Sequence, residues 1–261
     1  MQGARWLPIL LAEGALGALS LCLAAVAEPA PPELGAMFAS GEYLAAAQQA
    51  ESAASADNLA FAARSLLAQC MTADHDPDPA MVERAAVDAR RALTLDPMHE
   101  EGRLQLAIAL SLKSRSMALM DAWYAGYGEE GKKLAEAVLT MDPGNFYAHG
   151  FLAVWNVEVR RRGGVLGGRL LGASIEAGRR QYAIAAHLAP DDAGVHWQFA
   201  RALAALDAVR YGDEAAAILD RAVASSREDH VQLVMKARAV RLSEALRGNR
   251  KEAQALARAL L

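Results

Sequence analysis

Aromatic residues are scarce in this chain of 261 residues: they make up 6% of it, although hydrophobic residues make up 54%. The apolar content is therefore mostly alanine and leucine, which favour helices, whereas β-branched and aromatic strand formers are sparse. This balance excludes a β-sandwich or a β-barrel. It predicts a globular, all-helical protein that is long enough to bury a substantial core.

Positive charge and cysteine are also in short supply. The formal net charge is −4, whereas a general nucleic-acid binder needs a basic face. Two cysteines are too few for a disulfide framework or a Cys-rich zinc site. We therefore expect no nucleic-acid partner, and we expect Cys70, within an Ala/Leu helix, to lie in the core.

The first 27 residues have the pattern of a secretory signal peptide. Arg5 gives a positive start, an apolar stretch follows, and Ala25, Val26 and Ala27 form a small-x-small cleavage pattern before a Pro-rich segment. We predict cleavage after Ala27 and a mature, exported protein in the periplasm. The alternative is an uncleaved membrane anchor, although Glu13 interrupts any span of about 20 apolar residues. Membrane association is expected only in that case.

Internal repeats organise the rest of the chain. Residues 89–110, 133–154 and 180–201 align as an Ala-rich amphipathic helix, a Pro-containing turn and a second helix. Residues 218–240 form a fourth copy, with an arginine in place of the proline. The steps between successive marks of the four units are 46, 47 and 37 residues, and the marks are Pro97, Pro143, Pro190 and Arg227.

Alanine recurs at a fixed place in these units. It lies ten residues after each mark, at Ala107, Ala153, Ala200 and Ala237. Only a small side chain lets two helices approach closely, so this pattern predicts tight helix contacts at all four positions.

These helix pairs resemble tetratricopeptide (TPR) repeats. That family has a small–aromatic–small run along one helix and a proline before the next repeat, and the third unit matches it with Gly178, Tyr182, Ala185 and Pro190. The resemblance implies an α-solenoid of antiparallel helix hairpins with a concave binding face. The family repeats about every 34 residues. The longer first two steps therefore predict longer helices or ordered insertions in units one and two.

The pattern predicts a single repeat domain over residues 38–261, after a Pro-rich lead-in at 28–37. It has about five TPR-like hairpins and a C-terminal capping helix. The predicted helices are 38–53, 57–73, 80–95, 98–119, 128–141, 145–162, 173–188, 192–208, 212–225, 229–247 and 249–260.

Residues 163–172 form a glycine-rich stretch between two of these helices. A phosphate-binding loop would need a Walker lysine or a preceding strand, and the stretch has neither. We interpret it as a flexible inserted loop. The alternative is an anion-binding or ligand-binding loop, since four arginines bracket it: Arg160, Arg161, Arg162 and Arg169.

No residue pattern predicts catalysis, a cofactor or a metal site. The chain has no Gly-x-Ser-x-Gly nucleophile motif, and its six histidines form no zinc-binding pattern. His149 and His196 each lie six residues after a proline mark, and we expect them to be core histidines with satisfied hydrogen bonds. The acidic turn around His75 lacks the EF-hand glycine and glutamate. The sequence therefore favours a protein that is not an enzyme.

An aromatic cluster at residues 123–127 occupies the extra length of unit one. It fits two interpretations equally, as core filler or as a contact for a ligand or partner. With two arginines from the glycine-rich region it defines a candidate secondary site: Trp123, Tyr127, Arg162 and Arg169.

The TPR resemblance also implies which residues face the concave groove. Such a groove would change from apolar to basic along the array and would suit an extended peptide with an acidic or carboxylate end. The predicted function is a non-catalytic scaffold or adaptor for a peptide or protein partner. The alternative is a small-ligand-binding component resembling the T component of tripartite periplasmic transporters. The candidate groove residues, expected at the surface, are Tyr147, Glu158, Trp197, Arg201, Arg238 and Arg241.

Overall fold

The computed structural model describes residues 31–260, and every regular element in this part is an α-helix. Residues 1–27, with the predicted signal peptide and cleavage site, lie outside it. The helices are α1 (Pro32–Ser40), α2 (Tyr43–Ser52), α3 (Ala56–Thr72), α4 (Pro79–Leu95), α5 (Glu100–Arg115), α6 (Leu119–Tyr124), α7 (Tyr127–Met141), α8 (Phe146–Leu171), α9 (Ile175–Leu188), α10 (Ala193–Ala224), α11 (His230–Arg247) and α12 (Arg250–Ala259).

The second helix of each unit begins in the same register. Its N-cap lies two residues after the mark, and the cap side chain accepts a hydrogen bond from a backbone N–H of the first turn. Such a bond satisfies a donor that the helix itself leaves free. The four caps start α5, α8, α10 and α11 at His99, Asn145, Asp192 and Asp229.

Two histidines confirm that the units are equivalent. His149 is buried, with Nε2 3.0 Å from the carbonyl oxygen of Pro143, and His196 has the same contact with Pro190 at 3.0 Å. Each ring ties its helix back to the proline turn before it. The prediction of satisfied core histidines is confirmed.

Three of the four predicted close-contact alanines are fully buried: Ala107, Ala153 and Ala200. The prediction is wrong for Ala237, which is exposed on α11. Only the ten-residue α12 follows α11, and it packs against α10 as well. No further unit in the described part of the chain therefore covers this face of the last long helix.

The predicted helix map holds for most of the chain and differs at three segments: the lead-in, the region after Arg115 and the glycine-rich stretch. Helix α1 lies largely in the predicted lead-in, because its proline occupies the first turn, where the missing N–H costs nothing. The helix expected at 98–119 instead ends at Arg115, and the separate α6 follows.

The glycine-rich stretch is not a flexible loop, so that prediction is wrong. Helix α8 continues through it to Leu171 and is interrupted only at Gly164. The φ angle of Gly164 is 61°, a conformation that glycine adopts without the steric cost of a Cβ atom. A single permissive residue thus turns a long helix instead of ending it.

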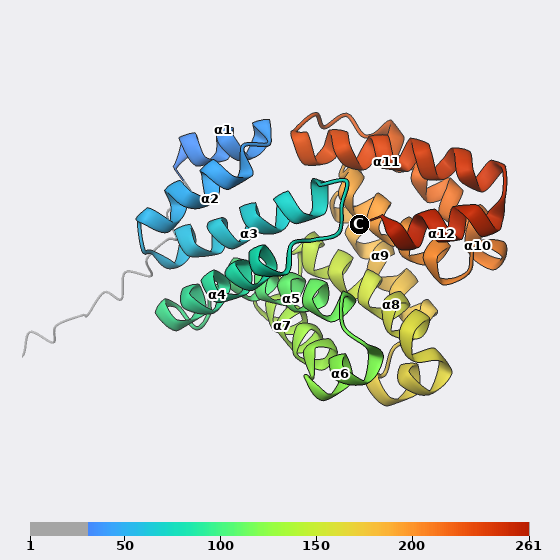
Figure 1. The fold of residues 1–261 in the computed structure, drawn as a ribbon, viewed down its shortest axis with the longest axis horizontal. Helices are drawn as coiled ribbons and strands as arrows, with labels where there is room; N and C mark the ends of the chain where they lie inside the picture. The colour runs from blue at the N-terminus through green and yellow to red at the C-terminus, as the bar shows by residue number, and fades with distance from the viewer. Residues whose placement is uncertain (1–30, 261) are drawn as a thin grey trace, which may run out of the picture.

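The two ends of the helix array meet. Helix α11 lies beside α1 and the end of α3 (Figure 1). Arg238 on α11 donates hydrogen bonds to the carbonyl oxygens of Thr72 and Ala73 at 3.1 and 2.7 Å, and the hydroxyl of Tyr43 is 3.0 Å from Nδ1 of His230. These contacts close the array across its concave face.

Two large apolar clusters hold the halves of the array. One joins α8 to α12, and the other joins α1 to α5. Cys70 is buried in α3, as expected.

Helix α10 breaks at Asp207, near the predicted end of the helix expected at 192–208. Among the described helices, none is long and apolar enough to cross a membrane.

Candidate functional site

The concave face of the array holds a pocket of about 250 Å³, here called the inner pocket. Four of the five helices that line it are the second helices of the repeat units: α5, α8, α10 and α11. The fifth is α3, whose end closes the array. The apolar part of the wall consists of Met71, Ile108, Leu112, Phe151, Val154, Val195, Val231 and Met235.

The lining follows a fixed register in the repeats. Residues four and eight positions after the mark line the inner pocket in units two, three and four. Residues eleven positions after it do so in units one, two and three. These offsets share one face of an α-helix. The residues are Tyr147, Phe151 and Val154 in α8, Gly194, Gln198 and Arg201 in α10, Val231 and Met235 in α11, and Ile108 in α5.

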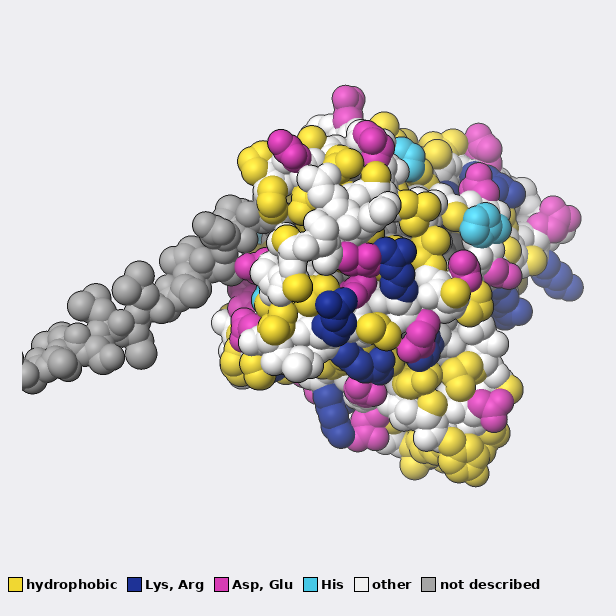
Figure 2. Space-filling model, turned by 60° about the vertical axis from the view of Figure 1, so that its left-hand side comes forward, with side chains coloured by type: hydrophobic (Ala, Val, Ile, Leu, Met, Phe, Trp, Pro, Cys, Tyr) yellow, Lys and Arg dark blue, Asp and Glu magenta, His cyan; other side chains and the backbone are white. Residues whose placement is uncertain are grey.

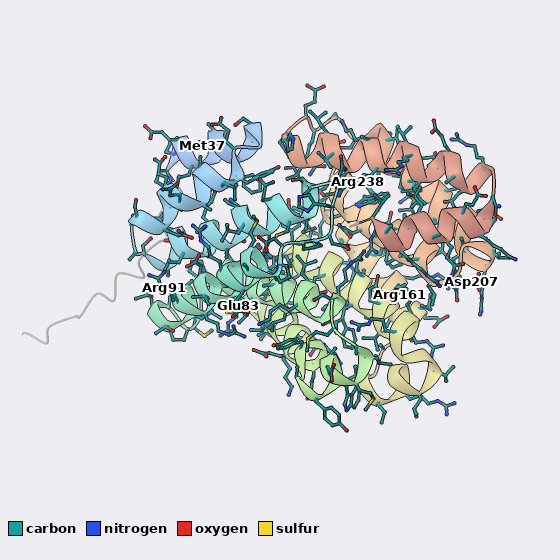
Figure 3. The ribbon with its side chains drawn as sticks, viewed as in Figure 1. Met37, Glu83, Arg91, Arg161, Asp207 and Arg238 are labelled. Atoms are coloured by element: carbon teal, nitrogen blue, oxygen red, sulfur yellow. The ribbon has the colours of Figure 1, made fainter. Side chains whose placement is uncertain are left out.

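Three arginines surround one glutamate in the inner pocket. Glu158 accepts hydrogen bonds from Arg161 at 2.7 Å and from Arg201 at 3.2 Å. Arg115 from α5 lines the same pocket and is electrostatically coupled to this cluster. Figure 3 labels Arg161 on α8. The cluster therefore carries more positive than negative charge.

The pKa values of the cluster show this imbalance. Burial opposes ionisation of Glu158, but the nearby charges of Arg201 and Arg161 outweigh it and lower the pKa of the carboxyl. Burial, and then the positive charge of Arg201, lower the pKa of Arg115 to about 10. Burial is the larger cause for Arg115, and the added repulsion from Arg201 shows positive charge that Glu158 does not fully neutralise.

One buried donor in this pocket lacks a hydrogen-bond acceptor. The side-chain oxygen of Gln198 accepts a hydrogen bond from Arg201 at 3.3 Å. The Nε2 of Gln198 is buried without a partner among the described residues. Such an orphaned N–H is costly unless a ligand or a water accepts from it.

A second pocket of about 170 Å³, here called the outer pocket, lies beside the inner one. It is formed by α6, α7 and the long α8, which are the elements that lengthen the first two units. Its wall contains four aromatic side chains, Trp123, Tyr127, Phe151 and Trp155. Arg162 lies between the two pockets and donates to the carbonyl oxygens of Ser114 at 2.7 Å and Met117 at 2.9 Å.

A solved structure shares this arrangement of helices. A thermophilic TPR protein from Thermus thermophilus is similar with a TM-score of 0.55 and 20% sequence identity, over 80% of this chain and 96% of that one. No protein-family model and no curated protein matches the chain. The fold is that of a TPR protein. The likeness concerns the fold alone.

The TPR register corrects one part of the predicted groove. Trp197 of α10 was expected on the groove wall, but its side chain is fully buried in the core. The residue lies seven residues after its mark, and Gly150 at the same offset in α8 does line the inner pocket. The offset alone therefore does not decide whether a residue lies in the groove or in the core.

The predicted arginines differ in their roles. Arg201 and Arg238 were expected at the surface, and both are buried, with 4% and 5% of their area exposed. Arg201 lines the inner pocket, whereas Arg238 binds the end of α3 and is absent from the lining. Figure 3 shows Arg238 on α11 at this junction. Arg241 is exposed and lines neither pocket.

Of the remaining predicted site residues, all but Arg169 line at least one of the two pockets. Tyr147 and Glu158 line the inner pocket. Trp123, Tyr127 and Arg162 line the outer one, whereas Arg169 is exposed and lines neither. Among the described residues, no group of three or more His, Cys, Asp or Glu side chains is placed to hold a metal ion.

The groove prediction left out several polar residues of the inner pocket, among them Gln198, Arg115 and Arg161, although Arg161 was named beside the glycine-rich stretch. Gln198 follows the offset of eight, which the groove prediction did not include. Arg115 and Arg161 occupy equivalent places, eighteen residues after Pro97 and Pro143. A search for one residue type at one offset could therefore have found both arginines.

Proposed function

We propose that this protein is a non-catalytic TPR-type binding module whose inner pocket holds an apolar chain ending in a carboxylate. The supporting observation is the combination of an apolar wall with three arginines around a single glutamate. Arginine recognises carboxylates through paired, charge-assisted hydrogen bonds. A bound carboxylate would also offset the repulsion between Arg115 and Arg201, and it would accept from the free N–H of Gln198.

The closed array limits which ligands reach the concave face. Arg238 ties α11 to α3, and Arg115 donates to the carbonyl oxygens of Arg258 at 2.7 Å and Leu260 at 3.3 Å. A folded partner cannot lie along a face bridged in this way. A thin chain fits, and two sources supply one: the C-terminal end of a peptide, as for an interaction scaffold, or a free organic acid, as for a small-ligand component.

Export belongs to the same proposal. The Ala25–Ala27 cleavage pattern and the Pro-rich segment after it support a mature chain that starts at Glu28 and acts in the periplasm. The mass of the intact protein recovered after secretion tests this step. A species that retains residues 1–27 would favour the membrane-anchored alternative.

Isothermal titration with matched charged and neutral probes tests the ligand class. We expect decanoate to bind and its methyl ester to bind at least tenfold more weakly, because the ester has no charge for the arginines. A hexapeptide ending in Ala-Val-Leu is compared with its C-terminal amide in the same way. The stronger of the two acids identifies the source of the chain.

A pair of neighbouring variants assigns the binding to the cluster. Arg161→Gln removes a donor from Glu158, while Arg201 still holds that glutamate, so decanoate binding should fall about tenfold. Arg160→Gln is the control, because Arg160 donates to the carbonyl of Gly164 and lines neither pocket. Equal binding by both variants, or equal binding of acid and ester, would overturn the proposal.

A further inference from the structure

The outer pocket is not used by the function proposed above, yet it adjoins the inner pocket directly. Six residues line both: Ser111, Ser114, Phe151, Val154, Glu158 and Arg162. Glu158 is one of them, and it holds Arg161 and Arg201. The charged cluster therefore stands where the two pockets meet. The result is two largely apolar compartments on either side of one anion-binding centre.

The outer compartment has the size and wall of a site for an aromatic ring. Its volume of about 170 Å³ is close to that of an engineered cavity of about 150 Å³ that binds benzene. Lys113 and Lys132 lie over the rings of Tyr127 and Trp155 at 5.2 and 5.3 Å. A cationic guest would meet these like charges, so an uncharged ring is the better occupant.

The surface around this compartment is apolar as well. Trp123 is 43% exposed, and large hydrophobic residues of α6 and of the end of α8 are exposed next to it in the fold, including Leu119, Leu166 and Leu170. Figure 2 shows hydrophobic side chains gathered at the lower end of the molecule, where α6 and the end of α8 lie. An aromatic group can therefore approach the outer pocket over an apolar surface.

We infer that the ligand carries two apolar arms that diverge from its carboxylate-bearing carbon: a chain in the inner pocket and an aromatic arm in the outer one. This inference rests on the proposed function and specifies its ligand class. An N-acylated aromatic amino acid has this form. So has the last residue of a peptide that ends in phenylalanine, tyrosine or tryptophan.

Two probes that differ only in the second arm test the inference. N-octanoylglycine has the carboxylate and the chain, and N-octanoyl-L-phenylalanine adds a benzyl group on the same carbon. Burial of a phenyl ring should make the second probe bind about tenfold or more tightly in isothermal titration. It should also change the fluorescence of Trp123 and Trp155, which line the outer pocket, whereas Trp197 is buried in the core.

Neighbouring variants on α6 assign the second arm to the outer pocket. Trp123→Ala should remove most of the advantage of the phenylalanine probe and leave the affinity for N-octanoylglycine unchanged. Tyr124→Ala is the matched control, because Tyr124 is 80% exposed and does not line the pocket. Neither side chain belongs to the buried core, so both variants should fold, which circular dichroism checks.

The outcomes separate this inference from the proposal on which it rests. If N-octanoylglycine binds in a manner that depends on Arg161 but the benzyl group adds no affinity, the two-arm ligand is wrong and the carboxylate site stands. If the benzyl group adds the same affinity in the Trp123→Ala variant, its site is not the outer pocket, which also contradicts the inference. If neither probe binds, the proposed function itself fails.

Discussion

Helices α8 and α10 have the same origin in the repeat but use the concave space differently. Both have their N-cap two residues after a proline mark, and both carry a histidine that contacts the proline carbonyl. Seven residues after the mark, α8 has Gly150, which lines the inner pocket, whereas α10 has Trp197, which is fully buried. The N-caps and the histidines fix the register of the helix backbone. The volume of the side chain at a few positions then decides whether that position lines a cavity or fills the core.

The largest change in stability is expected at Trp197, the side chain that fills the core beside α10. Trp197→Ala should lower the free energy of unfolding by about 3–5 kcal/mol, because it leaves a large cavity in the core. Urea unfolding followed by circular dichroism measures the change. A loss below about 1 kcal/mol would place Trp197 at a surface and remove the contrast with α8.

The close-contact alanines give the next largest difference. Ala200→Leu should cost about 1–3 kcal/mol, since the added methyl groups have no space in a packed core. Ala237→Leu, at the same offset in an exposed position, should change the stability by less than about 0.5 kcal/mol. Equal losses in the melting temperature would show that the two alanines are equally packed.

A smaller change, of opposite sign, is expected in α8. Gly150→Ala should raise stability by up to about 1 kcal/mol, because alanine is the better helix former and its Cβ would meet only Cγ2 of Val195 at 3.8 Å. Thermal unfolding measures this gain. A loss of stability would mean that the glycine is needed for helix packing and not for space in the pocket.

The smallest effect concerns the pH dependence of α10. Burial lowers the pKa of His196, so the folded protein holds this ring neutral below the pH at which the unfolded chain takes up a proton. The stability from His196 is therefore present above about pH 6.5 and is lost as the pH falls from there toward the folded pKa. The difference in melting temperature between the wild type and His196→Gln should narrow between about pH 7 and pH 5. A constant difference would contradict this linkage.

The sequence predicted the architecture because the residues of each repeat have strong local preferences for a helix or for a turn. Proline turns, small residues at contacts and helix-forming stretches each act within a few residues. The resulting TPR solenoid is the observed fold. The same reasoning failed at the glycine-rich stretch, because a helix can pass through several glycines when one of them, Gly164, absorbs the turn.

The pocket residues were harder to predict, because the offset in the repeat does not by itself decide between groove and core. Tyr147, Glu158 and Arg201 line the inner pocket, whereas Trp197, at the offset where Gly150 lines it, is buried in the core. Arg238 was expected in the groove, but it binds carbonyls of α3, including that of a residue 166 positions away in the sequence. No local pattern encodes a contact between such distant segments.

That distant contact changes how the array responds to stress. In an open solenoid each repeat touches only its neighbours, so stability is nearly a sum of local contributions. Here Arg238 and Thr72 are joined across 166 positions of the chain, and such a long loop carries an entropic cost that is met only after the intervening helices are ordered. Helices α3 and α11 therefore depend on each other, and the loss of either loosens the wall of the inner pocket, which both of them line.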